Sequence, residues 1–489
     1  MLLSRLRSAT EDPGAGSQED LQRRLEAIFA QAPELRPAPA LFDYPLTYPP
    51  AIAVQGPAHA GAPTDIERQE LGIGALPAAG YYFHFGFCQY KCRYCFHYEI
   101  KINRTDELKA RYVEALLTEM RRFRDLAPRL QTGLYFLGGG TPTALSLPQL
   151  ERFLDGLLQT FGPVPTAMST VEAKPVTATV DKLRALRAAG FSRINLGVQS
   201  LDPALYAQHH HGEPLSVALD AITRARALGF SFINIDLMTG LAGQTPASWQ
   251  RTLSEIERLV EAGAIDSLFI YPYHDDPRSR TFGEAGAVPP FIETAYSDAQ
   301  ARSLMERLGW SELGARFYRS PRHVRHELRE LARVRVNPAY GEVLYQGFGN
   351  SAFSLGDRAM WLNRRDIGDY CAAIEAGASP IGHWAPMNDA QRATRDLVFD
   401  LLYSPITRLR GRVRKYGADA HDHHAPLLQR WVDLGLGRLH RLSGTFSLTP
   451  FGKLLHLQMI PRHYLPADRG AFDAVMEARR LAGPDWRGY

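Results

Sequence analysis

The stretch YYFHFGFCQYKCRYCF, residues 81–96, decides the fold, because it joins a strand-like run to three closely spaced cysteines. Residues 81–85 are aromatic and apolar, as in a buried strand, so the cysteines should lie in the loop that follows. Cys88, Cys92 and Cys95 lie within eight residues of one another, whereas Cys371 is far away. One tight thiol cluster in a large chain indicates a metal site rather than a disulfide framework.

Two kinds of metal site fit these three thiols. Zinc would bind them in a tetrahedral site completed by His84 or His97. Alternatively, three thiolates bind three irons of a 4Fe-4S cluster and leave the fourth iron open to a chelating amino and carboxylate group. The cysteines taken alone leave both alternatives open.

A second motif, GGGTPT at residues 138–143, follows another apolar strand-like run. Glycine lets a backbone approach a ligand closely because it has no Cβ. Together the two motifs resemble the radical S-adenosylmethionine (SAM) superfamily, and specifically the branch of oxygen-independent coproporphyrinogen III oxidase and its relatives. The resemblance extends from about Gly80 to the C-terminal end. It implies that Cys88, Cys92 and Cys95 hold an oxygen-sensitive 4Fe-4S cluster.

Apolar runs alternate with longer amphipathic segments between residues 80 and 276, which predicts repeated βα units and a parallel sheet. We expect an α/β protein with a partial (β/α)6 radical SAM barrel whose strands lie at residues 81–85, 133–137, 167–172, 193–198, 232–237 and 267–273. Its functional residues should lie at the carboxyl ends of these strands. The expected domains are an N-terminal extension (1–75), the radical SAM core (76–290), a segment that completes the core and connects it (291–385), and a C-terminal α-rich, winged-helix-like domain (386–489).

The resemblance implies two bound SAM molecules. The residues that match contacts of the cleaved SAM are Tyr82, Gly139, Glu172, Pro272 and Phe353. The residues that match the second SAM site are Tyr94, Gly140, Thr141, Gln199, His211 and Asp236. The family usually has an arginine where this chain has His211. A guanidinium is permanently charged and can bind the SAM carboxylate through two N–H groups, which histidine cannot reproduce. For Glu172 the structural alternative is an ion pair with Lys174.

The sequence after the third cysteine, FHYEIKINR, differs from that of the coproporphyrinogen oxidase itself. Its CFHY context is more like the relatives that use the second SAM as a methyl or methylene donor. We therefore expect a class C methyltransferase-like enzyme in which the 5′-deoxyadenosyl radical activates the second SAM, and a small-molecule carbon is methylated or cyclopropanated. His97, Tyr98 and Glu99 are the candidate catalytic residues for proton transfer, unless they only pack the cluster loop.

Two other functions stay open. One is porphyrin chemistry, either as an oxygen-independent coproporphyrinogen III oxidase or as another enzyme that modifies heme. The other is a non-catalytic heme or cluster delivery protein. The substrate would be an aromatic or polyene natural-product intermediate or a tetrapyrrole, and a flavodoxin or ferredoxin would supply electrons.

The charge balance gives little sign of other partners. The 489-residue chain has 56 basic and 52 acidic residues, a formal charge of +4. This is too balanced to impose binding to nucleic acid or membranes, and the basic run from Arg408 to Lys415 is more typical of a solvated face. Neither a signal peptide nor a run of 18 apolar residues is present, so we expect a cytoplasmic protein.

Overall fold

The fold is that of a computed structural model, which describes residues 16–37, 78–95, 101–102, 105–273, 279–281, 289–324, 344–404 and 406–482. A 12-stranded sheet has the order β14-β13-β12-β11-β1-β4-β5-β6-β7-β8-β10-β9. Its central parallel strands are β1 (Ala78–Phe85), β4 (Gln131–Gly139), β5 (Thr170–Ala173), β6 (Arg193–Gln199), β7 (Phe232–Thr239) and β8 (Ser267–Pro272). The six expected strands and the α/β class are therefore confirmed.

The strand β5 begins three residues later than expected. The amide of Ser169 donates to the carbonyl of Thr166 at 3.0 Å, which closes a turn before the strand. The hydroxyl of Ser169 accepts a hydrogen bond from the amide of Tyr135, in the middle of β4, at 3.1 Å, and pairing between β4 and β5 begins one residue later, at Phe136 and Thr170. Local hydrogen bonding of Ser and Thr competes with strand pairing in this way.

The sheet continues beyond the six expected strands. A seventh parallel strand, β11 (Leu344–Phe348), pairs with β1. Antiparallel strands extend both edges: β12 (Phe353–Leu355), β13 (Ala359–Asn363) and β14 (Ile381–Pro386) follow β11, and β10 (Phe317–Arg319) and β9 (Ser311–Glu312) follow β8. The barrel wall therefore includes strands from residues 311–319 and 344–386.

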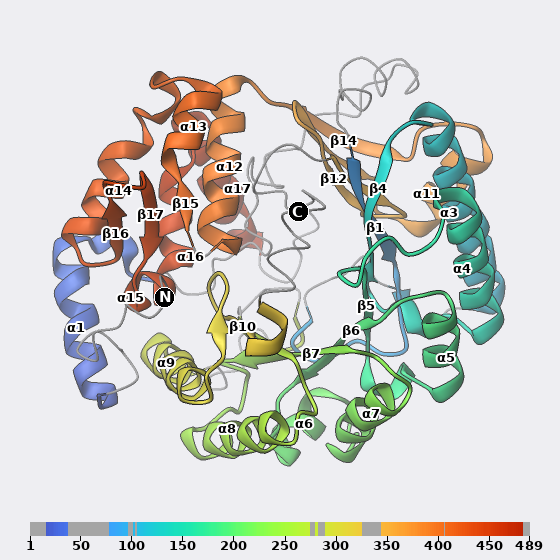
Figure 1. The fold of residues 1–489 in the computed structure, drawn as a ribbon, viewed down its shortest axis with the longest axis horizontal. Coiled ribbons are helices and arrows are strands. Elements are labelled where there is room, and N and C mark those ends of the chain that lie inside the picture. Colours follow the sequence, from blue (N-terminus) through green and yellow to red (C-terminus); the bar gives the residue numbers. More distant parts are fainter. Residues whose placement is uncertain are drawn as a thin grey trace.

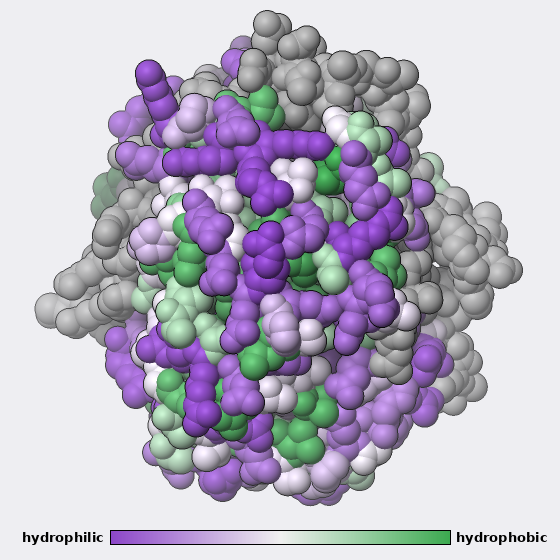
Figure 2. Space-filling model, turned by 90° about the vertical axis from the view of Figure 1, so that its right-hand side faces the viewer, coloured by the Kyte–Doolittle hydropathy of each residue, from purple (hydrophilic) through white to green (hydrophobic). Residues whose placement is uncertain are grey.

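Helices cover the outside of this curved sheet. They are α3 (Asp106–Leu126), α4 (Leu147–Phe161), α5 (Val180–Ala188), α6 (Pro203–His209), α7 (Ser216–Ala227), α8 (Pro246–Glu261), α9 (Phe291–Arg307) and α11 (Ile367–Glu375). Apart from α6, Figure 1 shows them along the right and lower edge, with the strands inside. Figure 2 shows the right-hand side of that view, where hydrophilic residues cover most of the surface and hydrophobic ones form small separate patches. The helices thus bury their apolar faces against the sheet, as amphipathic helices do.

The C-terminal domain is helical with a small sheet. Its main helices are α12 (Asp389–Tyr403), α13 (Leu409–Tyr416), α14 (His424–Asp433) and α17 (Pro466–Ala482), and its antiparallel sheet has the order β15 (Thr407–Arg408), β17 (Thr445–Leu448), β16 (Gly437–His440). A helix followed by a hairpin is the expected winged-helix-like arrangement. The N-terminal helix α1 (Gln18–Gln31) packs Leu21, Leu25 and Phe29 into the same core as Trp431.

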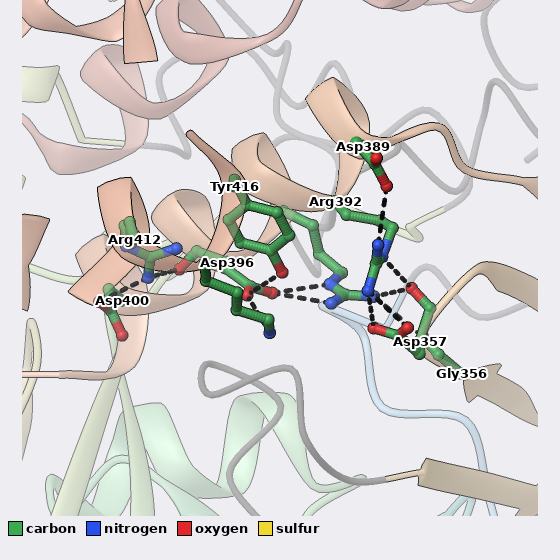
Figure 3. Close-up of polar contacts among 10 residues, drawn as sticks. Gly356, Asp357, Asp389, Arg392, Asp396, Asp400, Arg412 and Tyr416 are labelled. Atoms are coloured by element: carbon green, nitrogen blue, oxygen red, sulfur yellow. Dashed lines mark hydrogen bonds and ion pairs between the residues drawn. The ribbon is translucent and has the colours of Figure 1, made fainter. Parts of the chain in front are cut away.

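Charged side chains join the C-terminal domain to the barrel wall. Arg392 on α12 binds the carboxylate of Asp357 at 2.5 Å, and Arg395 donates to the carbonyl of Gly356 at 2.8 Å. Gly356 and Asp357 lie in the turn between β12 and β13 (Figure 3). The domain is therefore held against the sheet edge next to β11 and β1.

Among the described residues, no helix has the length and apolar character needed to cross a bilayer.

Candidate active site

The three clustered cysteines lie directly after the first strand of the barrel. Cys88 is on β2 (Phe87–Cys88), which pairs with β3 (Lys101–Ile102), and the amide of Cys95 donates to the carbonyl of Cys92 at 3.2 Å. All three are free thiols; Cys88 and Cys92 are buried, and Cys95 is partly exposed. In the part of the chain that the structure describes, no three His, Cys, Asp or Glu side chains lie close enough to hold a single metal ion.

The environment of the thiols fits a polynuclear cluster. In such a cluster each thiolate binds a different iron, so the sulfur atoms need not converge on one point. The ammonium group of Lys174 lies 3.2 Å from Sγ of Cys92, and the hydroxyl of Thr141 lies 3.3 Å from Sγ of Cys88. A cation and a hydroxyl beside the thiols suit a site that carries negative charge. Burial raises the pKa of the Cys88 thiol, while Lys174 and Thr141 oppose that rise.

The glycine-rich segment packs against the end of β1. The amide of Gly140 donates to the carbonyl of Phe85 at 2.7 Å, and a Cβ at Gly140 would lie 2.5 Å from the carbonyl oxygen of Phe87. Gly139 has φ +97°, in the left-handed region, and a Cβ there would lie 2.8 Å from Nδ1 of His84. A Cβ at Gly138 would similarly lie 2.8 Å from the carboxylate of Glu172. Glycine is therefore required at positions 139 and 140 for the close approach expected of a SAM-binding backbone.

His84 and Tyr82 lie side by side on the inner face of β1. The hydroxyl of Tyr82 is 3.1 Å from Nδ1 of His84. This contact and the packing against Gly139 place the imidazole beside the glycine-rich segment. His97, the other candidate for a fourth zinc ligand, lies outside the described residues, as do Tyr98 and Glu99, the other two candidate catalytic residues.

Two acidic side chains on the parallel strands have strongly raised pKa values. Burial, followed by the negative charge of Asp236, raises the pKa of Glu172 on β5 to about 8. Burial raises the pKa of Asp236 on β7 to about 7, against the hydrogen bond from Asn234 at 2.6 Å and the charges of Arg319 and Arg193. Each carboxylate would be stabilised by a bound cation, which makes both candidates for contacts with an ammonium or sulfonium group.

Lys174 is not available as the ion-pair partner that the structural alternative for Glu172 requires. Its ammonium group donates to Sγ of Cys92 and, at 2.9 Å, to the carbonyl of Tyr90. The sequence had suggested no role for Lys174 in the cysteine site. The signal that could have indicated one is its place directly after β5, at the same barrel edge as the cysteines.

The candidates for a second SAM site lie on the same side of the barrel. Gln199 ends β6 with φ +68°, after a register shift relative to β7, where Gly197 pairs with Asp236. Tyr94 lies in the cysteine loop, and its ring centroid is 6.1 Å from that of His209. Burial, followed by the thiols of Cys92 and Cys95, raises the pKa of Tyr94 well above its usual value.

His211 contacts the cysteine loop in this structure. Its Nε2 donates to the carbonyl of Lys91 at 2.7 Å, and its ring centroid is 4.7 Å from that of Tyr90. His211 has φ +57°, just after α6 ends at His209. Two further candidates for contacts with the cleaved SAM lie near opposite ends of the strand order. Pro272 ends β8, and Phe353 begins β12, which follows β11 at the other side of the parallel strands.

Comparison with known proteins identifies the class. Residues 82–256, which carry the cysteines, the glycine-rich segment, Glu172 and Asp236, match the family model of the radical SAM superfamily. An oxygen-independent coproporphyrinogen III oxidase from Bradyrhizobium diazoefficiens is 28% identical over 357 residues, which cover 72% of this chain and 78% of that protein. The heme chaperone HemW of Bacillus subtilis is 26% identical over 385 residues, covering 76% and 96%.

The fold agrees with this class. The solved structure of coproporphyrinogen III oxidase from Escherichia coli, described as a radical SAM enzyme, has a TM-score of 0.74 at 21% identity and covers 87% of this chain and 99% of its own. The chain is therefore a radical SAM protein. Within that superfamily it is similar to the oxygen-independent coproporphyrinogen III oxidase-like branch, and the superfamily implies a 4Fe-4S cluster and SAM.

The expected methyl or methylene transfer is wrong. The relatives that match about three quarters of the chain are named oxygen-independent coproporphyrinogen III oxidase, anaerobilin synthase and heme chaperone, and none is named for methylation or cyclopropanation. That expectation rested on the few residues after Cys95. Residues so close to the cluster ligands indicate the structure of the cluster loop more than the identity of a substrate. A substrate must also contact side chains from distant parts of the chain.

Proposed function

We propose that this chain is a radical SAM enzyme that removes a hydrogen atom from a tetrapyrrole, and that a coproporphyrinogen is the substrate to test first. The observation that carries the proposal is the match to the Bradyrhizobium oxidase over 357 residues, which extends well beyond the SAM-binding segment 82–256. An oxidase that works without oxygen needs another oxidant. A barrel with a SAM site can supply one.

The residues of the site have distinct tasks in this proposal. Cys88, Cys92 and Cys95 would hold the cluster, and the backbone around Gly139 and the carboxylate of Glu172 would hold the amino and ribose groups of SAM. Once bound, SAM and the reduced cluster supply a 5′-deoxyadenosyl radical, which takes a hydrogen atom from a C–H bond. The barrel wall and the C-terminal domain would keep water and oxygen away from the reacting groups.

A second SAM site is part of the proposal. Asp236 supports it, because a buried carboxylate with a raised pKa gains from a cationic ligand. His211 already donates from Nε2 to Lys91. Only its protonated imidazole could also donate from Nδ1 to a SAM carboxylate. Equilibrium dialysis of reconstituted protein with labelled SAM should therefore give two SAM per chain, and one per chain for Asp236→Asn.

The experiment on the main proposal uses anaerobically reconstituted protein, dithionite, SAM and coproporphyrinogen III. Liquid chromatography with mass spectrometry should show 5′-deoxyadenosine and an oxidised, decarboxylated tetrapyrrole, both absent from Cys92→Ala. A flavodoxin or ferredoxin is the electron donor that we propose in place of dithionite in the cell. If the tetrapyrrole is recovered unchanged, the oxidase proposal fails.

Heme delivery is the second candidate, because the match to HemW covers 96% of that chaperone. A delivery protein would bind heme stoichiometrically and release it intact. Absorption spectroscopy of a heme titration, followed by transfer to an apo-heme protein, distinguishes this outcome from substrate turnover.

A further inference from the structure

Lys174 is built into the cysteine site by three contacts of its ammonium group. The group lies 3.2 Å from Sγ of Cys92, 2.9 Å from the carbonyl of Tyr90 and 4.0 Å from the centroid of the Tyr90 ring. Tyr90 and Cys92 belong to the cysteine loop, whereas Lys174 follows β5. The lysine therefore ties the loop to the barrel wall at a cluster ligand.

The backbone holds Lys174 in this position. Its carbonyl accepts hydrogen bonds from the amides of Thr177 and Ala178 at 3.0 and 3.1 Å, which close the 3-10 turn Pro175–Thr177. The hydroxyl of Thr177 donates to the same carbonyl at 3.0 Å. The turn therefore fixes the backbone from which the side chain of Lys174 extends to Cys92 and Tyr90.

The surroundings make its charge effective. Cys92 is only 2% exposed, so little water screens the interaction between the ammonium group and Sγ. A positive charge and an N–H donor at a cluster thiolate favour the state with more negative charge.

We propose that Lys174 is a positioning residue that acts through Cys92 to raise the reduction potential of the iron–sulfur cluster. One electron from the donor reduces the cluster, no bond of the protein forms or breaks, and the added negative charge is stabilised by the nearby ammonium. The inference rests on the proposed cluster at Cys88, Cys92 and Cys95. It goes beyond that site by assigning the control of its redox behaviour to a residue that is not a ligand.

The test is a redox titration of the reconstituted full chain without SAM. The amount of reduced cluster at each potential is measured by electron paramagnetic resonance. Lys174→Met should reduce the ratio of reduced to oxidised cluster at a fixed potential about tenfold, which is about 59 mV for one electron. Iron and sulfide content of each variant is measured in parallel. The readout does not depend on SAM cleavage or on substrate.

Matched variants separate charge from structure. Lys182 on α5 also donates to a backbone carbonyl, that of Thr143 at 2.7 Å, without a thiol partner, so Lys182→Met should keep the wild-type midpoint. Lys174→Arg retains the charge and should keep a midpoint near wild type. Lys174→Gln retains a donor without the charge and should shift as Lys174→Met does, which covers the case in which the methionine variant fails to assemble its cluster.

The outcomes are distinguishable. Equal midpoints for wild type, Lys174→Met and Lys174→Gln overturn the inference while leaving the proposed function intact. If the midpoint is unchanged but the SAM-induced spectral change needs far more SAM, Lys174 binds a carboxylate of SAM instead, which also overturns it. A wild-type protein that assembles no cluster would overturn both proposals.

Discussion

The backbone of Gly139 lies against the imidazole of His84 so closely that a Cβ on Gly139 would be 2.8 Å from Nδ1. The contact joins the glycine-rich end of β4 to the inner face of β1, and these two strands pair along their length. The SAM-binding edge is therefore shaped by a contact between neighbouring strands as well as by the left-handed conformation of Gly139.

The first prediction uses this contact. Gly139→Ala should weaken SAM binding at least tenfold and destabilise the fold by about 1–3 kcal/mol, because it combines strain at φ +97° with a clash against His84. Gly162→Ala is the matched control, since Gly162 has φ +90° and no atom within 4 Å of the added Cβ. Isothermal titration with SAM should separate the two variants. Equal SAM affinity in both would remove the assigned role of the His84 contact.

The second prediction concerns the pH dependence of SAM binding. Burial and then Asp236 raise the pKa of Glu172 to about 8, so this carboxyl is protonated in the free protein at neutral pH. A cationic group of SAM would need the ionised form. The dissociation constant for SAM should therefore rise about tenfold for each pH unit below about 8, until other groups titrate.

Two variants test the origin of that pH profile. Glu172→Gln should bind SAM weakly and without the profile. Asp236→Asn removes the neighbouring negative charge, so the profile should move to lower pH. Because Glu172 and Asp236 interact, the wild-type pH profile gives apparent pKa values of the pair. The pKa of each single carboxyl group is measured in the variant that lacks the other one. An unchanged profile in Glu172→Gln would assign it to another group.

The third prediction concerns the buried ion pairs of the C-terminal domain. Arg412 on α13 contacts Asp400 on α12 at 2.5 Å, and both side chains are buried (Figure 3). Asp400→Asn leaves the guanidinium without its carboxylate and should cost about 3–5 kcal/mol. Glu114→Gln breaks the Arg152–Glu114 pair, whose side chains are 46% and 52% exposed, and should cost about 0–1 kcal/mol. Urea denaturation followed by circular dichroism measures the free energy of unfolding of both variants. Comparable losses in the two would contradict the stabilising role assigned to the buried Arg412–Asp400 pair.

The fourth prediction concerns acid sensitivity of the same domain. Burial, followed by neighbouring histidines, lowers the pKa of His424 to about 2 and of His463 to about 3. Both would have a pKa near 6.5 in the unfolded chain, which therefore binds more protons below that pH. Their neutral, buried forms therefore cost no stability above about pH 6.5. As the pH falls below that value, the free energy of unfolding decreases, because the unfolded chain takes up protons that the folded chain cannot. These two histidines should lower the free energy of unfolding by about 2 kcal/mol between pH 6.5 and 5.5.

A variant isolates one of these histidines. Nε2 of His463 accepts a hydrogen bond from the indole of Trp431 at 3.0 Å, and a glutamine oxygen could accept it as well. His463→Gln should therefore lose about 1 kcal/mol of the pH dependence between pH 6.5 and 5.5 while its tryptophan fluorescence stays close to wild type. Identical pH dependence in the two proteins would rule out the assignment.

The six parallel strands could be predicted because each is a short apolar run followed by an amphipathic helix. The strand β11 could not, because its pairing with β1 joins segments far apart in the chain. The start of β5 was missed for a local reason, the turn from Thr166 to Ser169. Sequence patterns report periodicity well, but they carry little information on long-range pairing.

The cysteines and the glycine-rich segment were recognisable because the chemistry fixes residue type and spacing. The partners of Lys174 and His211 were not, because both contacts depend on how the cysteine loop folds back on the barrel. The type of reaction was misjudged, because the expectation of methyl or methylene transfer rested on the few residues after Cys95.

The most direct test of the proposed function follows a hydrogen atom. Reconstituted protein is incubated anaerobically with dithionite, unlabelled SAM and coproporphyrinogen III deuterated on its propionate side chains, and the 5′-deoxyadenosine is examined by mass spectrometry. We predict one deuterium in 5′-deoxyadenosine, together with a tetrapyrrole that has lost carbon dioxide. Unlabelled 5′-deoxyadenosine with intact tetrapyrrole would contradict hydrogen abstraction from this substrate.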